Sequence, residues 1–240
     1  MKNKYISYRY ELRLENGEIQ IFEFLIDKND LNLVEKTAPL MPDWTLRKEF
    51  GCVNDKCNLK PNDYCPVAVT TNKLINHFHG IASTVRVAVK VISNDRIYSK
   101  ETSFQQAVSS ISGILMSTCG CPILGKLKPL VRFHLPFSTL EETEFRVFSM
   151  FLLAQYFKKR NGLIETENFG ELKELYSEIQ VINRLSAQKI QEIERSDATI
   201  NGLVILDTFA LSVTFNLDDD DFSQMESLFA EWLKPTKKSE

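Results

Sequence analysis

Hydrophobic and polar residues alternate with a period of two in two stretches near the start of the chain. The first stretch, residues 5–22, is centred on Asn16-Gly17, and the second, residues 85–98, contains Asn94-Asp95. Alternation on both sides of such a pair is typical of a β-hairpin, because each strand buries one face and the turn needs residues that tolerate positive φ. The first hundred residues therefore predict two antiparallel hairpins.

The apolar residues elsewhere recur at helical spacing. They predict helices over approximately 66–80, 104–119, 139–159, 172–193, 198–213 and 221–233. Ser138/Thr139 followed by Glu141/Glu142 is a capping-box start for the third of these helices. Because that helix is apolar nearly all round, we expect it to be central and buried.

Strands followed by helices predict an α+β fold, in which an antiparallel, hairpin-rich N-terminal part packs on a C-terminal helical bundle. We assign residues 1–103 to the β-rich part, with a cysteine loop at 50–66, and residues 104–240 to the helical part. No low-complexity linker separates them. We therefore expect one compact unit.

Composition and charge limit the class of protein, its location and its partners. Of the 240 residues, 43% are hydrophobic and 25% are charged, as in soluble globular proteins. The longest mostly apolar run, Val147 to Phe157, is about half of a membrane span, so no membrane insertion is expected. The N-terminus does not read as a secretory signal, which favours the cytoplasm. The net charge of −3 and the lack of a basic cluster interleaved with aromatic residues argue against a nucleic-acid partner.

Five cysteines carry the clearest chemical signal. Cys52, Cys57 and Cys65 fall in the 50–66 loop, and Cys119 and Cys121 follow later. In the cytoplasm thiols stay reduced, so clustered cysteines indicate a metal site more often than disulfides. The spacing of the first two suits zinc, and the third precedes a proline that begins a helix, where the helix dipole favours a thiolate.

The fourth ligand can be narrowed by distance. His77 would lie about 18 Å along the helix from Cys65, too far to share a metal. Cys121, Cys119 and His134 remain. Our predicted zinc ligands are Cys52, Cys57 and Cys65, with the fourth ligand taken from the three residues that remain. An iron–sulfur cluster is the alternative metal group, although the ferredoxin spacings are absent. Without a metal, the cysteines would be buried small hydrophobic residues or redox-sensitive thiols.

Two other groups of residues could form a catalytic or binding site. His134 could activate Cys119 or Cys121 as a nucleophile. His134, Glu142 and Arg146 could line a polar pocket, in which the last two form an i,i+4 pair on one helix face. Helix capping and ion pairing account for the same residues without a site. The sequence contains no phosphate-binding glycine loop, no GxSxG and no HExxH.

Several segments together resemble a bacterial family of unknown function. They are the CPVA cysteine loop, the GCP turn, RFHLPF, and EET-x2-R leading to SMFLLAQYF. In that family the first two cysteines are closer together than Cys52 and Cys57, and serine is commoner at the position of Cys119. The resemblance implies no activity, and it favours Cys121 over Cys119 as the fourth ligand.

We therefore expect a cytosolic, non-enzymatic protein. Its zinc would be structural, and its helical part would bind a protein partner or sense a small ligand. The alternative is an enzyme, which would use either Cys119 or Cys121 with His134, or a helical pocket built on Glu142 and Arg146.

Overall fold

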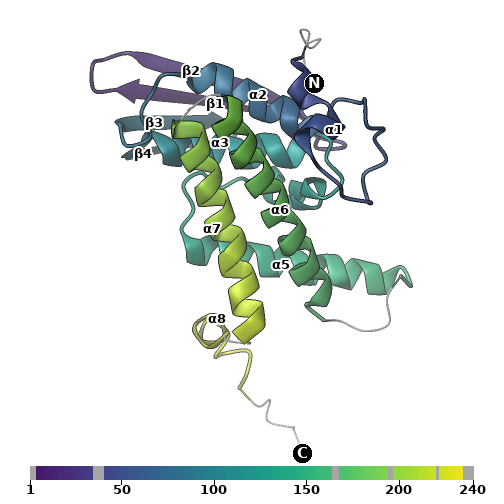
Figure 1. Cartoon of the computed structure of the whole chain (residues 1–240). Helices are drawn as coiled ribbons and strands as arrows, with labels where there is room; N and C mark the ends of the chain where they lie inside the picture. Colours follow the sequence, from purple (N-terminus) through teal and green to yellow (C-terminus); the bar gives the residue numbers. More distant parts are fainter. Residues whose placement is uncertain (1–3, 35–40, 164–167, 194–196, 220–221, 235–240) are drawn as a thin grey trace, which may run out of the picture.

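The computed structural model of the chain describes residues 4–34, 41–163, 168–193, 197–219 and 222–234. Four strands form one sheet: β1 (Tyr5–Leu14), β2 (Ile19–Asp27), β3 (Arg86–Ser93) and β4 (Ile97–Ser103). Their order is β2-β1-β3-β4, and all neighbouring strands are antiparallel. Both predicted hairpins are confirmed, and Gly17 at the first turn has a φ of 86°. The sheet and α8 (Ser223–Ser227) lie at opposite ends of the molecule (Figure 1).

Helices make up most of the rest of the chain (Figure 1). They are η1 (Asp43–Thr45), α1 (Arg47–Phe50), α2 (Pro66–Phe78), α3 (Phe104–Thr118), η2 (Leu124–Leu127), α4 (Lys128–Arg132), α5 (Leu140–Arg160), α6 (Gly170–Ile193), α7 (Asp197–Asp219) and α8 (Ser223–Ser227). The α+β class is confirmed. The helix predicted over 198–213 extends to Asp219, and the one predicted over 221–233 is reduced to the five residues of α8. The short elements η1, α1, η2 and α4 were not predicted, because they are too short to show a helical stripe.

Helix α3 lies between two hydrophobic clusters. Toward the sheet, Phe104 and Ile111 pack with Tyr10 and other residues of β1 and β3. Toward the helices, Met116 joins a cluster that contains residues of α2, α5, α6 and α7. The sheet and the helical bundle thus share one central helix. A close approach of α7 to α3 at Gly202 completes this contact.

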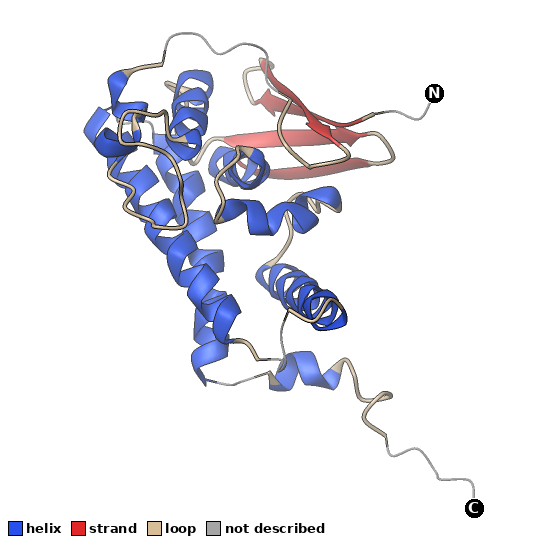
Figure 2. Ribbon diagram, turned by 90° about the vertical axis from the view of Figure 1, so that its right-hand side faces the viewer, coloured by secondary structure: helices blue, strands red, loops and turns tan. Residues whose placement is uncertain are grey.

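Helix α5 differs from the prediction. Leu152, Leu153, Tyr156 and Phe157 are each about half exposed, and the helix packs mainly on α4 and α7. Figure 2 shows it standing apart from the paired helices α6 and α7. The prediction of a central, buried helix is therefore wrong. An all-round apolar composition shows which faces would gain from burial, but not whether another element covers each of them.

Helix α7 is the longest apolar helix of the chain. By length and composition alone it is, among the described residues, the one helix that could cross a membrane. It packs on α3 and α6, and the core helices of soluble proteins have the same composition. This weak signal was missed in the sequence, where the more obvious apolar run lies in α5.

Candidate functional site

The cysteine loop between α1 and α2 is held in place by backbone contacts. Gly51, with a φ of 81°, ends α1, and the guanidinium of Arg47 donates to the backbone oxygen of Asn54 (2.9 Å) and to that of Leu59. The Asn54 side chain in turn donates to Glu178 of α6 (3.0 Å). The loop is therefore fixed at its base and docked on the helical part.

The four predicted ligands come together around one small cavity. Cys52, Cys57, Cys65 and Cys121 all line it, together with apolar residues such as Phe50 and Ile182. They come from three separate places in the chain: the loop, the N-terminus of α2, where Cys65 is the N-cap, and the turn after α3. The cavity measures about 20 Å³, which is room for one water or ion.

Cys119 takes a different direction from Cys121. Its Sγ donates to the backbone oxygen of Met116 (3.0 Å), and it does not line the small cavity. The intervening Gly120 has a φ of 102°, a backbone conformation that suits glycine. The structure therefore brings Cys121 to the three loop cysteines.

Burial disfavours the thiolate at three of the five cysteines. Burial raises the pKa of Cys65 to about 11 and that of Cys119 to about 12, and it also raises the pKa of Cys121. Within the described ranges, no three histidine, cysteine, aspartate or glutamate side chains already stand in the arrangement of a metal site. A zinc ion about 2.3 Å from each sulfur would require the four thiols to lose their protons and close in.

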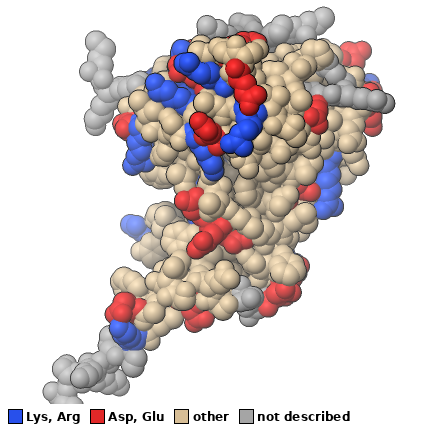
Figure 3. Space-filling model, turned by 90° about the vertical axis from the view of Figure 1, so that its left-hand side faces the viewer, with Lys and Arg blue, Asp and Glu red and all other residues tan. Residues whose placement is uncertain are grey.

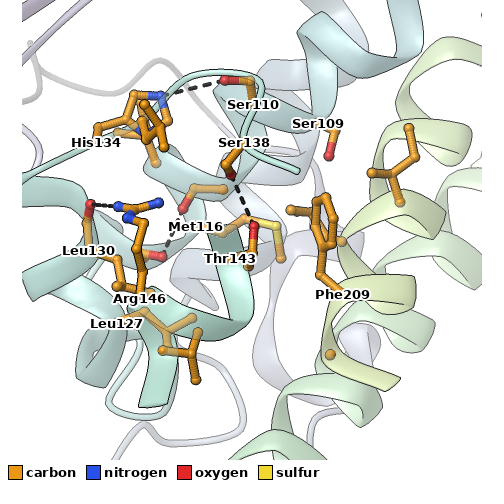
Figure 4. A pocket seen from close by; sticks show the side chains of 18 of the residues that line it. Ser109, Ser110, Met116, Leu127, Leu130, His134, Ser138, Thr143, Arg146 and Phe209 are labelled. Atoms are coloured by element: carbon orange, nitrogen blue, oxygen red, sulfur yellow. Dashed lines mark hydrogen bonds between the residues drawn. The ribbon is translucent and has the colours of Figure 1, made fainter. Parts of the chain in front are cut away.

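A second, much larger cavity opens between the helices. It measures about 450 Å³ and is bounded by α3, α4, α5, α6, α7 and the loop after α4. In Figure 4, His134 and Arg146 lie on one side of this cavity and Phe209 of α7 on the other. Its walls are mostly apolar, with several hydroxyl groups and a few amide, imidazole, guanidinium and ammonium groups among them. Such walls are typical of a small-molecule site.

His134 is held as a neutral imidazole. Its Nε2 lies 2.7 Å from the hydroxyl of Tyr10 and 3.4 Å from that of Ser110, and its ring meets Tyr8 edge-on. Burial, assisted by the charge of Arg146, lowers the pKa of His134 to about 3. The Nε2 of a neutral imidazole accepts from the Tyr10 hydroxyl when Nδ1 carries the proton, and donates to it when Nε2 does. His134 lines the large cavity and neither Cys119 nor Cys121 does, so the structure does not bring the imidazole and these thiols together.

Arg146 is half-buried in the wall of the same cavity. Its Nη2 donates to the backbone oxygens of Leu130 (2.9 Å) and Phe133 (3.0 Å) at the end of α4. Glu142, four residues earlier, does not line the cavity. Its carboxylate instead accepts from the backbone N–H of Thr139 (2.7 Å), while its own N–H donates to the Thr139 hydroxyl (3.1 Å). Glu142 therefore forms the predicted capping box, and only Arg146 of this pair faces the cavity.

Two residues of the cavity were missed in the sequence. Tyr176 and Asn183 of α6 line it, and their side chains are only 5% and 3% exposed. Neither the Tyr176 hydroxyl nor the Asn183 amide forms a hydrogen bond within the described part of the chain. The sequence signal was present: both are polar residues, seven positions apart, on the otherwise apolar stripe that includes Leu172 and Ile179.

Comparison with known proteins gives a family but no activity. No curated protein matches the chain, and no solved structure matches it. The family described as "Domain of unknown function (DUF6901)" matches residues 6–230. This match confirms the expected resemblance to an uncharacterised family. Because it spans nearly the whole chain, the protein belongs to the DUF6901 family, a domain of unknown function.

Proposed function

We propose that the protein is a non-enzymatic binding protein that senses a small, largely apolar ligand in the cavity of about 450 Å³. The observation that carries this proposal is a large, mostly apolar cavity into which two largely buried polar side chains, Tyr176 and Asn183, open without a hydrogen bond to the described residues. Their polar atoms are not among the fully enclosed atoms without a partner, so they are accessible from the cavity. A ligand that enters the cavity would find both groups available for hydrogen bonds.

The chemistry of the cavity favours binding over catalysis. A general base works best when its pKa lies near the working pH, whereas the pKa of His134 is about 3 and its Nε2 is engaged by Tyr10. The nearby Arg146 is a fixed cation that caps the end of α4. These groups suit the recognition of a polar atom on a ligand.

We assign a structural role to the cysteine cluster, with zinc as its metal. This proposal is supported by the position of four cysteines around one cavity that has room for one ion: Cys52, Cys57, Cys65 and Cys121. A zinc ion with four sulfur ligands has no open position, so it would stabilise the fold without taking part in a reaction. It would join the 50–66 loop to the end of α3.

We also propose a cytoplasmic location, without nucleic-acid partners or membrane insertion. Cysteine thiolates persist as metal ligands where thiols stay reduced. On the face shown in Figure 3, Lys and Arg are mixed with Asp and Glu and do not form a basic stripe. Packing of α7 on α3 and α6 offers an explanation for its apolar composition within a soluble protein.

The ligand site is tested by filling the cavity. Ala210 is 2% exposed and lines the cavity from α7, whereas its neighbour Leu211 is 45% exposed. We expect the wild type to bind a neutral solvatochromic dye saturably at about one per chain. Ala210→Phe should weaken that binding at least 10-fold, because the ring takes up cavity volume. Leu211→Phe should leave the binding unchanged.

Circular dichroism and a thermal melt establish that both variants are folded. Saturable binding that Ala210→Phe does not weaken would place the dye outside the cavity and contradict the proposal. Failure of the wild type to bind the dye or any amphiphile would contradict it as well.

A further inference from the structure

The charge of Arg146 is only partly balanced. Its Nη2 contacts two backbone oxygens, which carry partial negative charge, but no carboxylate of the described residues lies within ion-pair distance of its guanidinium. The remaining guanidinium N–H groups have no hydrogen-bond partner among those residues. The charge of Glu142 acts on Arg146, but Glu142 is exposed and is engaged in the capping box. An anion in the cavity would compensate this half-buried cation further.

Tyr176 supplies a second donor to the same region. The charge of Arg146 is close enough to act on the Tyr176 hydroxyl, and that hydroxyl makes no hydrogen bond to the described residues. Both residues line the same cavity. A guanidinium and a hydroxyl together match the two oxygens of a carboxylate, and hydrogen bonds to a charged acceptor are the strong ones.

Most of the remaining wall is apolar, although Lys100 and several serine and threonine hydroxyls also line the cavity. Leu124, Leu127, Val147, Ile179 and Leu206 contribute to its walls. A small inorganic anion would satisfy Arg146 but leave these walls uncovered. A purely apolar molecule would cover the walls but leave the Tyr176 hydroxyl unpaired. The volume of about 450 Å³ lies within the usual range for sites that enclose a whole small ligand.

We propose that the cavity binds an amphipathic monocarboxylate, with its carboxylate at Arg146 and Tyr176 and its hydrocarbon body along the apolar walls. This inference rests on the proposed ligand-binding function and names the class of ligand. It assigns a recognition role to two residues: Arg146 as the counter-charge and Tyr176 as the hydrogen-bond donor.

The test is a titration of the purified full-length protein by calorimetry. The probes are straight-chain monocarboxylates of roughly 8 to 14 carbons and the primary alcohols of the same lengths, below their micelle concentrations. We expect the best carboxylate to bind about 10-fold or more tightly than the matching alcohol. Tyr176→Phe should weaken carboxylate binding about 10-fold while leaving alcohol binding within about 2-fold.

Tyr176→Phe is informative because it removes an unpaired hydroxyl and keeps the ring. Its thermal stability without ligand should equal or exceed that of the wild type, which a structural role of the hydroxyl would not produce. Tyr156→Phe is the matched control, because Tyr156 is 55% exposed on α5. Arg146→Gln should remove the preference for carboxylate over alcohol in whatever fraction remains folded.

The outcomes separate the two proposals. If alcohols and carboxylates bind equally well, or if Tyr176→Phe weakens both alike, the carboxylate assignment is overturned while the binding function stands. If no probe binds and the neutral dye does not bind either, the binding function itself is overturned.

Discussion

The hydrogen bond between the Tyr10 hydroxyl and Nε2 of His134 (2.7 Å) joins the sheet to the loop after α4. Burial and the charge of Arg146 keep this imidazole neutral. In water His134 would take up a proton near its ordinary pKa of about 6.5, but in the folded protein its pKa is about 3. The unfolded chain thus binds a proton at a pH where the folded protein does not.

This difference predicts how stability depends on pH. A base whose pKa is lowered on folding contributes its full share of stability above pH 6.5 and loses it progressively as the pH falls toward 3. We expect the free energy of unfolding to fall by up to about 1.4 kcal/mol per pH unit over that window. His134→Gln, whose amide oxygen can still accept from Tyr10, should flatten this slope in urea unfolding between pH 4 and 7.

His77 is the internal comparison. Burial also lowers its pKa, and its ring packs against Phe22 and Phe78, so His77→Gln should flatten the slope less than His134→Gln. Equal slopes in the wild type and in His134→Gln would contradict the assignment of a neutral imidazole.

Helices α3 and α7 pack closely because Gly202 of α7 has no side chain. A Cβ added at Gly202 of α7 would lie 3.0 Å from Cγ1 of Val108 and 3.2 Å from the backbone nitrogen of Ser109. A Cβ added at Gly113 of α3 would meet only Cδ2 of Leu206, at 3.6 Å, which is an ordinary contact. The two glycines lie in the same pair of helices but in different surroundings.

Substitution by alanine at these two positions should therefore have different effects on the free energy of unfolding. Gly202→Ala is expected to destabilise the protein by about 1–3 kcal/mol, because the two helix backbones must move apart. Gly113→Ala should be neutral or stabilising by up to about 1 kcal/mol, because alanine favours the helix and meets no obstacle. Urea unfolding of both variants measures this, and a Gly202→Ala variant as stable as the wild type would show that α7 does not pack so closely.

Local signals predicted most of the elements correctly. The hairpin at Asn16-Gly17 and the capping box of Thr139 and Glu142 depend on neighbours in sequence, and both are confirmed. The exposed side of α5 and the large cavity depend on how distant elements pack. A polar residue on an apolar stripe, such as Tyr176 or Asn183, has no meaning until that packing is known. The sequence alone therefore predicted the secondary structure and the fold class better than the cavity.

At the scale of the whole molecule, the cysteine cluster would join a loop of the N-terminal part to the end of α3. We expect the untagged purified protein to contain about one zinc per chain. Cys121→Ser should lose the zinc and lower the melting temperature by about 5 °C or more, as expected for a loss of about 2 kcal/mol. Elemental analysis and thermal melts measure both effects.

Cys119→Ser is the matched control, because Cys119 does not line the small cavity, and it should keep its zinc. A Cys121→Ser variant that retains the metal would contradict this ligand set. If the purified protein is brown and contains iron and sulfide, the cysteines bind an iron–sulfur cluster instead of zinc. If the wild type contains no metal and has four reactive thiols, the proposal of a metal site is wrong.

The positions of Tyr176 and Asn183 on α6 have one more consequence. Seven residues of helix separate them, which is about 10 Å along the axis. A ligand whose carboxylate is fixed near Tyr176 reaches Asn183 only if its body has the matching length, and only a polar atom at its far end can pair with the amide. The spacing of these two residues on α6 would then make binding selective for the length of the ligand as well as for its charge.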